Sequence, residues 1–135
     1  MKKGLQSRFF SDKSMISAIV LTKNSAKTLE ATLRSLSPFA DVVVYDTGSE
    51  DDTLQIARTF PYVRIEQGPF LGFGATHNEA AKRALFDWIL SIDSDEVVSQ
   101  QLCQEILSLS LDPRAVYQIY RRNFFNGKET CICDF

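Results

Sequence analysis

Four short apolar runs constrain the fold of this chain more than any other feature, because one helix fits between each pair of neighbours. The runs begin at Ile16, Val42, Val63 and Trp88, so successive starts lie 26, 21 and 25 residues apart. Near-continuous apolar runs of this length are typical of strands that a parallel sheet buries on both faces. The sequence therefore predicts an α/β fold, in which a βαβ series builds a mainly parallel sheet.

Cap and turn signals place the remaining elements. Thr76-His77-Asn78-Glu79 has the Thr-x-x-Glu form of a capping box and is expected to begin the third helix. Ser99 is placed to cap a fourth helix. Residues 116–120 are expected to form a fifth strand, and Asn126-Gly127 is a strong signal for a hairpin.

Length and composition indicate one domain with a substantial core, since 44% of the 135 residues are hydrophobic. The formal net charge of -2 gives no reason to expect nucleic acid as a partner. No stretch approaches the about 20 apolar residues of a membrane span, so we expect a cytoplasmic protein. Residues 1–14 are expected to be a loosely ordered basic leader, with peripheral contact to the inner membrane as the alternative. Cys103, Cys131 and Cys133 are expected to be reduced thiols.

Three carboxylates follow the fourth apolar run, at Asp93, Asp95 and Glu96. Open α/β sheets bind their ligands at the carboxyl ends of the strands, so these side chains are expected at the mouth of a site. Carboxylates one residue apart repel each other and any phosphate, unless a hard divalent cation lies between them and bridges to phosphate oxygens. A turn capped by Asp93, with the other two charges in solvent, is the equally weighted alternative from these residues alone.

Polar residues also follow the first two apolar runs, at Thr22 and Asn24 and at residues 46–49. A parallel sheet brings all these strand ends to one edge. Asp46 only accepts hydrogen bonds, which suits an N–H of a base or a ribose hydroxyl, and Thr22 can donate or accept beside it. The alternative is a turn capped by Asp46, in which a glycine supplies backbone freedom. Asp51 is expected to serve the start of the following helix.

A glycine-rich stretch at residues 72–78 adds a candidate phosphate contact to the same edge. Backbone N–H groups at a helix start favour phosphate, and His77 and Asn78 add hydrogen-bonding side chains. A loop that needs glycine for close packing, with Asn78 bonded internally, is the alternative.

Together these segments resemble the donor-binding half of family 2 glycosyltransferases with the GT-A fold. Order, spacing and strand context agree over roughly residues 15–125 for four segments, which are Ile16 to Asn24, Val42 to Thr53, Gly72 to Asn78 and Trp88 to Glu96. Asp87 to Glu96 and Arg121 to Lys128 are most similar to lipopolysaccharide-core glucosyltransferases.

The resemblance implies a GT-A, Rossmann-like nucleotide-binding fold over residues 15–135, and that domain is expected to be partial. The family's catalytic base and acceptor wall lie downstream of the segment where this chain ends, so no residue is assigned as the base. The chain is thus expected to be truncated after the donor half. An uncovered sheet edge and apolar face would favour a homo-oligomer formed through Phe124, Phe125 and Ile132.

The same resemblance implies roles for individual residues. Thr22 and Asp46 would contact the nucleobase and ribose, and Asp95 would bind Mg or Mn directly. The metal would neutralise the diphosphate as an inverting displacement moves the sugar from a nucleotide sugar, with UDP favoured, to a glycan or lipopolysaccharide-core acceptor. The expected donor-binding residues are Thr22, Asn24, Asp46, Gly48, Ser49, His77, Asn78 and Asp93, and the expected metal ligands are Asp93 and Asp95. His77 stands where relatives often have arginine, and it is a weaker, pH-dependent phosphate partner.

Three other functions are weighed against this one. A non-catalytic nucleotide-sugar-binding module would match the same residues, since no base is assigned. A nucleotidyltransferase would need a glycine-rich, basic phosphate loop after the first strand, where the chain has Thr22-Lys23-Asn24-Ser25. A receiver-like domain would need acidic residues at that position, and the sequence has none there.

Overall fold

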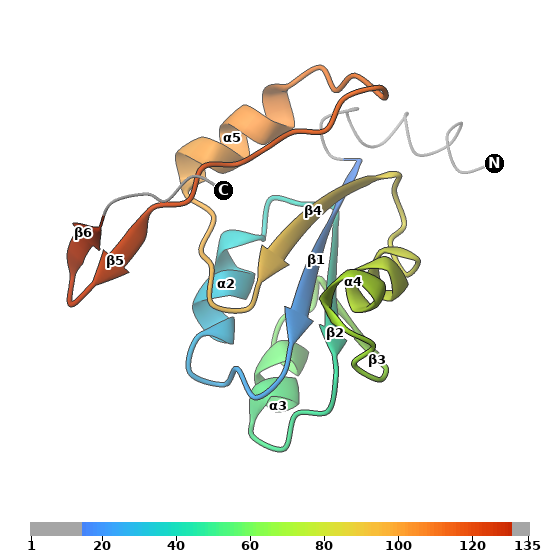
Figure 1. The fold of residues 1–135 in the computed structure, drawn as a ribbon, viewed down its shortest axis with the longest axis vertical. Coiled ribbons are helices and arrows are strands. Elements are labelled where there is room, and N and C mark those ends of the chain that lie inside the picture. Colours follow the sequence, from blue (N-terminus) through green and yellow to red (C-terminus); the bar gives the residue numbers. More distant parts are fainter. Residues whose placement is uncertain (1–14, 131–135) are drawn as a thin grey trace.

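A four-stranded parallel sheet forms the centre of the molecule (Figure 1). The computed structural model describes residues 15–130. The strands are β1 (Ile16–Thr22), β2 (Asp41–Asp46), β3 (Val63–Gln67) and β4 (Trp88–Asp93). Their spatial order is β3-β2-β1-β4, and each neighbouring pair is parallel. The α/β fold and the four strands expected from the spacing of the apolar runs are therefore confirmed.

Helices cover both faces of the sheet (Figure 1). Residues of α2 (Leu29–Ser35), α3 (Thr53–Arg58) and α5 (Gln100–Ser108) join the core on one face, and those of α4 (Phe73–Ala81) join it on the other. In β1, Ala18 and Val20 pack toward the first group, whereas Ile19 packs toward α4. Burial on both faces explains why β1 and β2 are apolar almost without interruption.

The strand β4 lies at an edge of the sheet, and its two faces differ. Leu90 and Ile92 are buried in the core that α2 and α5 share, whereas Ile89, Ser91 and Asp93 are exposed on the opposite face. The alternation is what a strand with one covered face requires. Asp93 thus ends β4 on an exposed face, where a ligand can reach it.

The expected fifth strand at residues 116–120 is wrong, because this segment has no strand structure. Val116 is 94% exposed, and the segment contacts the sheet through a side chain, with the ring of Tyr117 edge-on to Trp88 at a centroid distance of 5.7 Å. A strand needs backbone partners, and alternating apolar residues alone do not supply them.

The hairpin expected at Asn126-Gly127 is confirmed. It joins β5 (Asn123–Phe125) to β6 (Lys128–Thr130), and the two strands pair antiparallel as a separate sheet. Both turn residues have positive φ, 49° at Asn126 and 75° at Gly127, which a two-residue turn of this kind requires. Figure 1 shows the hairpin projecting away from the parallel sheet.

The capping box expected at Thr76 is also wrong, because α4 begins three residues earlier, at Phe73. Thr76 lies inside the helix, and its hydroxyl oxygen accepts a hydrogen bond from the Leu71 N–H at 2.8 Å. Glu79 does not turn back to the helix start but pairs with Lys82 Nζ at 2.6 Å. By contrast, Ser99 caps α5 as expected, since its Oγ accepts from the Leu102 N–H at 3.1 Å.

One buried carboxylate, that of Asp41, links several elements at the amino edge of the sheet. It accepts from Ser17 Oγ at 2.6 Å and from the Leu85 N–H at 2.9 Å. The guanidinium of Arg64 donates to both of its oxygens, at 2.9 and 3.1 Å. This single side chain therefore links β1, β2, β3 and the segment before β4.

Some expectations fall on residues that the structure does not describe. These are the basic leader at residues 1–14 and the proposed roles of Cys131, Ile132 and Cys133. Cys103 is buried with a free thiol, and burial raises the pKa of that thiol. Among residues 15–130, the helices are too short or too polar for any of them to cross a bilayer.

Candidate functional site

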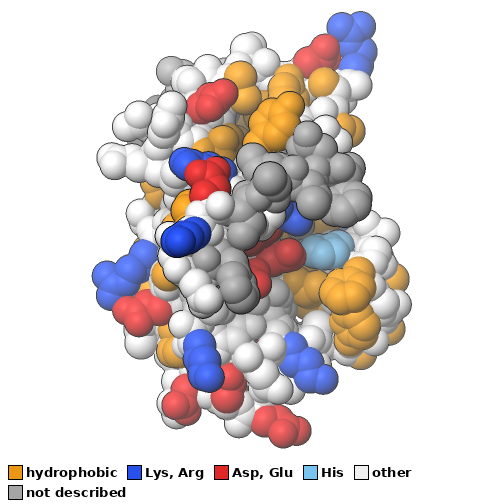
Figure 2. All heavy atoms as spheres, turned by 60° about the vertical axis from the view of Figure 1, so that its left-hand side comes forward, with side chains coloured by type: hydrophobic (Ala, Val, Ile, Leu, Met, Phe, Trp, Pro, Cys, Tyr) orange, Lys and Arg blue, Asp and Glu red, His pale blue; other side chains and the backbone are white. Residues whose placement is uncertain are grey.

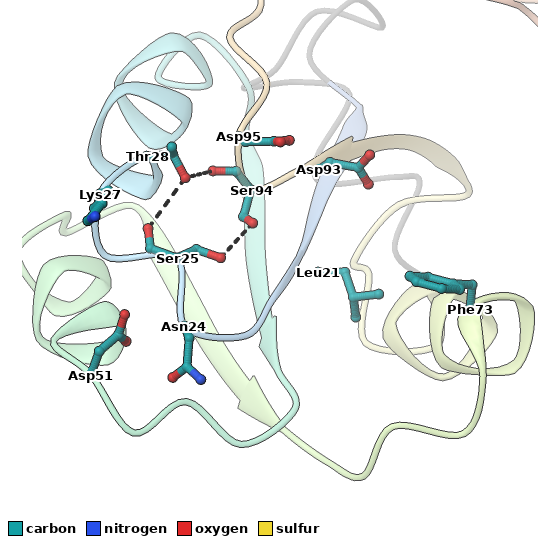
Figure 3. A pocket seen from close by; sticks show the side chains of 10 residues that line it. All are labelled: Leu21, Asn24, Ser25, Lys27, Thr28, Asp51, Phe73, Asp93, Ser94 and Asp95. Atoms are coloured by element: carbon teal, nitrogen blue, oxygen red, sulfur yellow. Dashed lines mark hydrogen bonds between the residues drawn. The ribbon is translucent and has the colours of Figure 1, made fainter.

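A pocket opens at the carboxyl edge of the sheet, at the point where the strand order changes direction. The chain passes from β1 to β2 on one side, and β4 lies against β1 on the other. Open α/β sheets bind ligands in the crevice at such a switch point. The pocket has a volume of about 680 Å³, which is typical of small-molecule sites. It is lined by Leu21, Asn24, Ser25, Lys27, Thr28, Asp51, Phe73, Asp93, Ser94 and Asp95 (Figure 3).

The turn after β4 presents two carboxylates to this pocket and uses a third for its own structure. Glu96 Oε2 accepts from the Asp93 N–H at 3.0 Å, and the Asp93 carbonyl accepts from the Glu96 N–H at 3.0 Å. Arg121 Nε lies 2.7 Å from Glu96 Oε1, and Nη2 lies 3.9 Å from Asp93 Oδ2. The carboxylate of Asp95 has no hydrogen-bond or ion-pair partner within residues 15–130. Glu96 rather than Asp93 thus caps the turn, which leaves Asp93 and Asp95 for a ligand.

Ser94, between these two aspartates, is fixed against the start of α2. Its carbonyl oxygen accepts from Thr28 Oγ1 and Thr32 Oγ1, both at 2.9 Å. Its hydroxyl oxygen lies 2.7 Å from Ser25 Oγ (Figure 3). The acidic turn is therefore held through both the backbone and the side chain of its central residue.

Asp46 ends β2 as a carboxylate that is only 1% exposed. Oδ1 accepts from Thr22 Oγ1 at 3.2 Å and from the Ser49 hydroxyl, while Oδ2 accepts from the N–H groups of Gly48 and Ser49 at 3.1 and 3.0 Å. Gly48 has a φ of 116°, in the region that favours glycine. The turn capped by Asp46 is therefore confirmed, and nucleotide contact by Thr22 and Asp46 stays a prediction.

Asn24 joins the first two strand ends. Its N–H donates to Ser49 Oγ at 2.8 Å, and its Oδ1 accepts from the Glu50 N–H at 2.8 Å. Asp51 Oδ1 accepts from the N–H of Thr53 at 3.0 Å and from the Thr53 hydroxyl, as expected of a residue that serves the start of α3. The hydroxyl bond from Thr53 lowers the pKa of Asp51.

The α4 side of the pocket is aromatic, and the two polar residues expected there lie outside its lining. Phe73 lines the pocket, is 73% exposed and packs edge-on against Phe70 at a centroid distance of 5.2 Å. His77 Nδ1 lies 3.4 Å from Ser91 Oγ, on the exposed face of β4 that also holds Asp93. Figure 2 shows acidic side chains beside the histidine, with hydrophobic side chains adjoining it. Asn78 is exposed.

The carboxylate oxygens in the pocket are suitable ligands for Mg or Mn bound together with phosphate. These hard cations prefer oxygen ligands, and Mg is usually held by one or two carboxylates while waters and substrate phosphates complete its coordination. In the described part of the chain, no group of three or more His, Cys, Asp or Glu gathers closely enough to cage a metal alone. Asp93 and Asp95 would supply the protein's share of such a site.

Three of the residues expected to bind the donor or the metal line this pocket, Asn24, Asp93 and Asp95. The other expected residues lie outside its lining, and these are Thr22, Asp46, Gly48, Ser49, His77 and Asn78. Several residues that contact the pocket or its acidic turn were not expected from the sequence. Ser25, Thr28 and Thr32 gave no sequence signal beyond their closeness to a helix start. Arg121 reaches the acidic turn from a segment 25 residues beyond it, so only the tertiary structure shows the contact.

Comparison with known proteins gives a consistent family. The family model described as glycosyl transferase family 2 matches residues 17–130. An uncharacterised glycosyltransferase of Rickettsia prowazekii is 33% identical over 84% of this chain and 40% of its own length. A lipopolysaccharide core biosynthesis glycosyltransferase of Rhizobium meliloti is 26% identical over 83% of this chain and 44% of its own. This chain therefore spans less than half the length of these two relatives.

The fold is also similar to that of a solved enzyme. Glucosyl-3-phosphoglycerate synthase from Mycobacterium tuberculosis, in complex with Mn2+, UDP-glucose and phosphoglyceric acid, matches with a TM-score of 0.53 and 25% identity. The match covers 60% of this chain and 33% of that one. Since the family model covers most of the chain and the sheet has the expected order, the chain belongs to glycosyl transferase family 2.

Proposed function

We propose that this chain forms the donor-binding part of a metal-dependent glycosyltransferase that uses a nucleotide sugar, with UDP as the favoured nucleotide. One observation supports this above all. Three aspartates line the pocket at the switch point of the sheet, and one of them, Asp51, is bonded to Thr53 at the start of α3. Of the other two, the carboxylate of Asp95 has no protein partner within residues 15–130, and that of Asp93 has only a contact of 3.9 Å to Arg121. Acidic side chains directed into a pocket of this size favour a cation as part of the ligand.

The signs of the charges point to a diphosphate bound with its metal. Two carboxylates would repel a diphosphate alone, and a divalent cation between them reverses that interaction. When bound, the metal would supply Lewis-acid stabilisation of the departing nucleoside diphosphate. Lys27, on the opposite wall of the pocket, can add a positive charge for the phosphates (Figure 3). The solved relative with Mn2+ and UDP-glucose supports this ligand class.

The acceptor and the stereochemistry belong to the same proposal. A glycan or lipopolysaccharide-core acceptor is supported by the Rhizobium meliloti relative, whose name refers to lipopolysaccharide core biosynthesis. Inverting displacement follows from the family resemblance, and no residue of this chain is assigned as the base. Cytoplasmic location, peripheral membrane contact and homo-oligomer formation stay predictions.

The test is the binding of UDP to the purified chain by isothermal titration calorimetry, with Mn2+ and with chelator. Asp95→Ala should abolish the metal-dependent part of the affinity and leave the thermal transition nearly unchanged, because its carboxylate has no protein partner within residues 15–130. Asp87→Ala is the matched control, since Asp87 is an exposed aspartate that precedes β4 at its other end. Metal-dependent affinity that survives in Asp95→Ala would contradict the assignment.

A non-catalytic nucleotide-sugar-binding module is the second candidate. The same pocket supports it, because Asp93 and Asp95 can bind a metal ion and a nucleotide sugar without any turnover. Incubation with UDP-glucose and Mn2+ separates the two functions, because release of UDP, with glucose transferred to an acceptor or to water, requires turnover. Binding without any UDP release would favour the module.

A further inference from the structure

The loop between β1 and α2 bridges the two polar strand ends of the site. On one side, the N–H of Ser25 donates to Thr53 Oγ1 at 2.8 Å, and Thr53 in turn bonds Asp51 at the start of α3. On the other side, Ser25 Oγ lies 2.7 Å from Ser94 Oγ in the acidic turn. Figure 3 shows Ser25 between Asp51 and Ser94.

The hydrogen bonds around Ser25 and Ser94 restrict both side chains. Ser25 Oγ lies 2.7 Å from Ser94 Oγ and 3.3 Å from the Lys23 carbonyl oxygen, so each hydroxyl can take part in the contact as donor or acceptor. The Ser94 carbonyl already accepts from two threonine hydroxyls of α2. With both its carbonyl and its hydroxyl bonded, Ser94 has little freedom to rotate.

We propose that Ser25 is a positioning residue for metal-assisted nucleotide binding, acting through Ser94; this rests on the proposed function above. Asp93 and Asp95 flank Ser94 in the chain, so the backbone torsions of Ser94 set the separation and relative orientation of the two carboxylates. A ligand pair held in advance binds a cation without the entropic cost of being ordered first. Ser25 thereby joins the loop that lines the nucleotide side of the pocket to the turn that supplies the metal ligands.

The role predicts a pattern that a general structural defect would not produce. Ser25→Ala and Ser94→Ala should each weaken UDP binding in Mn2+ by about fivefold, the size expected for one net hydrogen bond. The double variant should bind about as weakly as either single one, because both changes remove the same contact. In chelator, all three should bind UDP as the unmodified chain does, since the Ser25 N–H still bonds Thr53.

The experiment is a double-mutant cycle by isothermal titration calorimetry on the full chain, with UDP as the probe in Mn2+ and in chelator. Ser37→Ala is the matched control, because Ser37 is an exposed serine just after α2 and its side chain forms no hydrogen bond within residues 15–130. Thermal unfolding of every variant accompanies the titrations. Mn2+ electron paramagnetic resonance without nucleotide should show weaker metal binding in Ser25→Ala as well.

The possible failures are distinguishable. Single variants that bind like the unmodified chain, or a double variant about 25-fold weaker, would overturn the positioning role alone. Equal losses of affinity in Mn2+ and in chelator would also overturn it, because they indicate a damaged pocket. An unmodified chain that binds UDP no better with Mn2+ than with chelator would overturn the proposed function, and the role of Ser25 with it.

Discussion

The strand β2 has a buried aspartate at each end. Both accept a hydrogen bond from a hydroxyl of β1, but only one of them forms an ion pair. Ser17 and Thr22 of β1 lie opposite Asp41 and Asp46 in the register, and each donates its hydroxyl across the strand pair. Asp41 also receives two hydrogen bonds from the guanidinium of Arg64. In the described part of the chain, no lysine or arginine forms an ion pair with Asp46.

The presence or absence of an ion pair distinguishes a structural carboxylate from one whose negative charge is not neutralised. The charge of Asp41 is neutralised within the sheet, at the edge away from the pocket. Asp46 is stabilised only by neutral N–H and hydroxyl donors, which tolerate a buried carboxylate without cancelling its charge. Asp46 lies outside the pocket lining, but it bonds the Ser49 hydroxyl, whose oxygen accepts from the N–H of Asn24 in that lining. We therefore predict that the same arrangement serves stability at the amino edge and ligand binding at the carboxyl edge.

Asp41→Ala tests the structural side of this comparison and should have the largest effect. It would remove the acceptor of the Ser17 hydroxyl and of the Leu85 N–H, and within residues 15–130 would leave Arg64 with the Arg83 carbonyl only. We expect the free energy of unfolding to fall by about 3 kcal/mol, as when one partner of a buried pair is removed. Urea denaturation followed by circular dichroism measures this. A loss below about 1 kcal/mol would mean that Asp41 is no more structural than an exposed pair.

Gly68→Ala tests whether a residue at the carboxyl edge of the sheet contributes to stability through packing alone. A Cβ at Gly68 would lie 1.9 Å from the hydroxyl oxygen of Tyr45, which is buried beside Asp46. We expect destabilisation of about 2 kcal/mol, the usual cost of overpacking. Tyr45→Phe in the same chain should restore only part of this, because the ring carbon Cζ would still lie 2.7 Å away. Full tolerance of Gly68→Ala would show that the ring moves freely.

Unlike Asp41→Ala, Asp46→Asn should reduce UDP affinity more than it reduces stability. Asparagine keeps one acceptor oxygen, and the hydroxyls of Thr22 and Ser49 can turn to accept from its amide. We therefore expect a loss of about 1 kcal/mol in stability and a fall of about tenfold in UDP affinity. Calorimetry and urea denaturation of the same sample compare the two. A variant that unfolds but binds UDP normally when folded would make Asp46 a turn cap only.

Arg121→Gln should have the smallest effect on stability. Arg121 is 64% exposed, and exposed ion pairs of this kind contribute less than about 1 kcal/mol. Removing its positive charge should instead tighten the binding of Mn2+ alone, because Asp93 then faces no competing cation. Arg122→Gln is the matched control, since Arg122 pairs with Glu129 in the hairpin. Weaker Mn2+ binding in Arg121→Gln would mean that the arginine organises the turn.

The fold was predictable where local pattern and tertiary environment agree. Strands β1 and β2 are apolar almost throughout because helices cover both of their faces, and that pattern is visible in sequence. The segment at 116–120 has a similar pattern but no backbone partner. Tyr117 of this segment packs against Trp88, and the local sequence gives no sign of this contact.

The site was predictable in its carboxylates and not in what holds them. Asp93 is the last residue of β4 and Asp95 follows two positions later, so a rule about strand ends finds them. Ser25 and Arg121 contact the acidic turn across 69 and 25 residues of chain, respectively, and no spacing rule relates those positions. Serine and threonine are common near helix starts, so the sequence at Ser25 or Thr32 does not predict their contacts with Ser94.

The strand order has a consequence for how the protein becomes competent to bind. β4 pairs with β1 although β2 and β3 lie between them in the chain, so the acidic turn reaches the pocket only through a contact of long sequence separation. Such contacts form late, since a long loop must close first. Until then the nascent sheet holds Asp46 but has no aspartate pair from β4. On the proposal that Asp93 and Asp95 bind a divalent ion, we predict that uptake of this ion follows the pairing of β4 with β1.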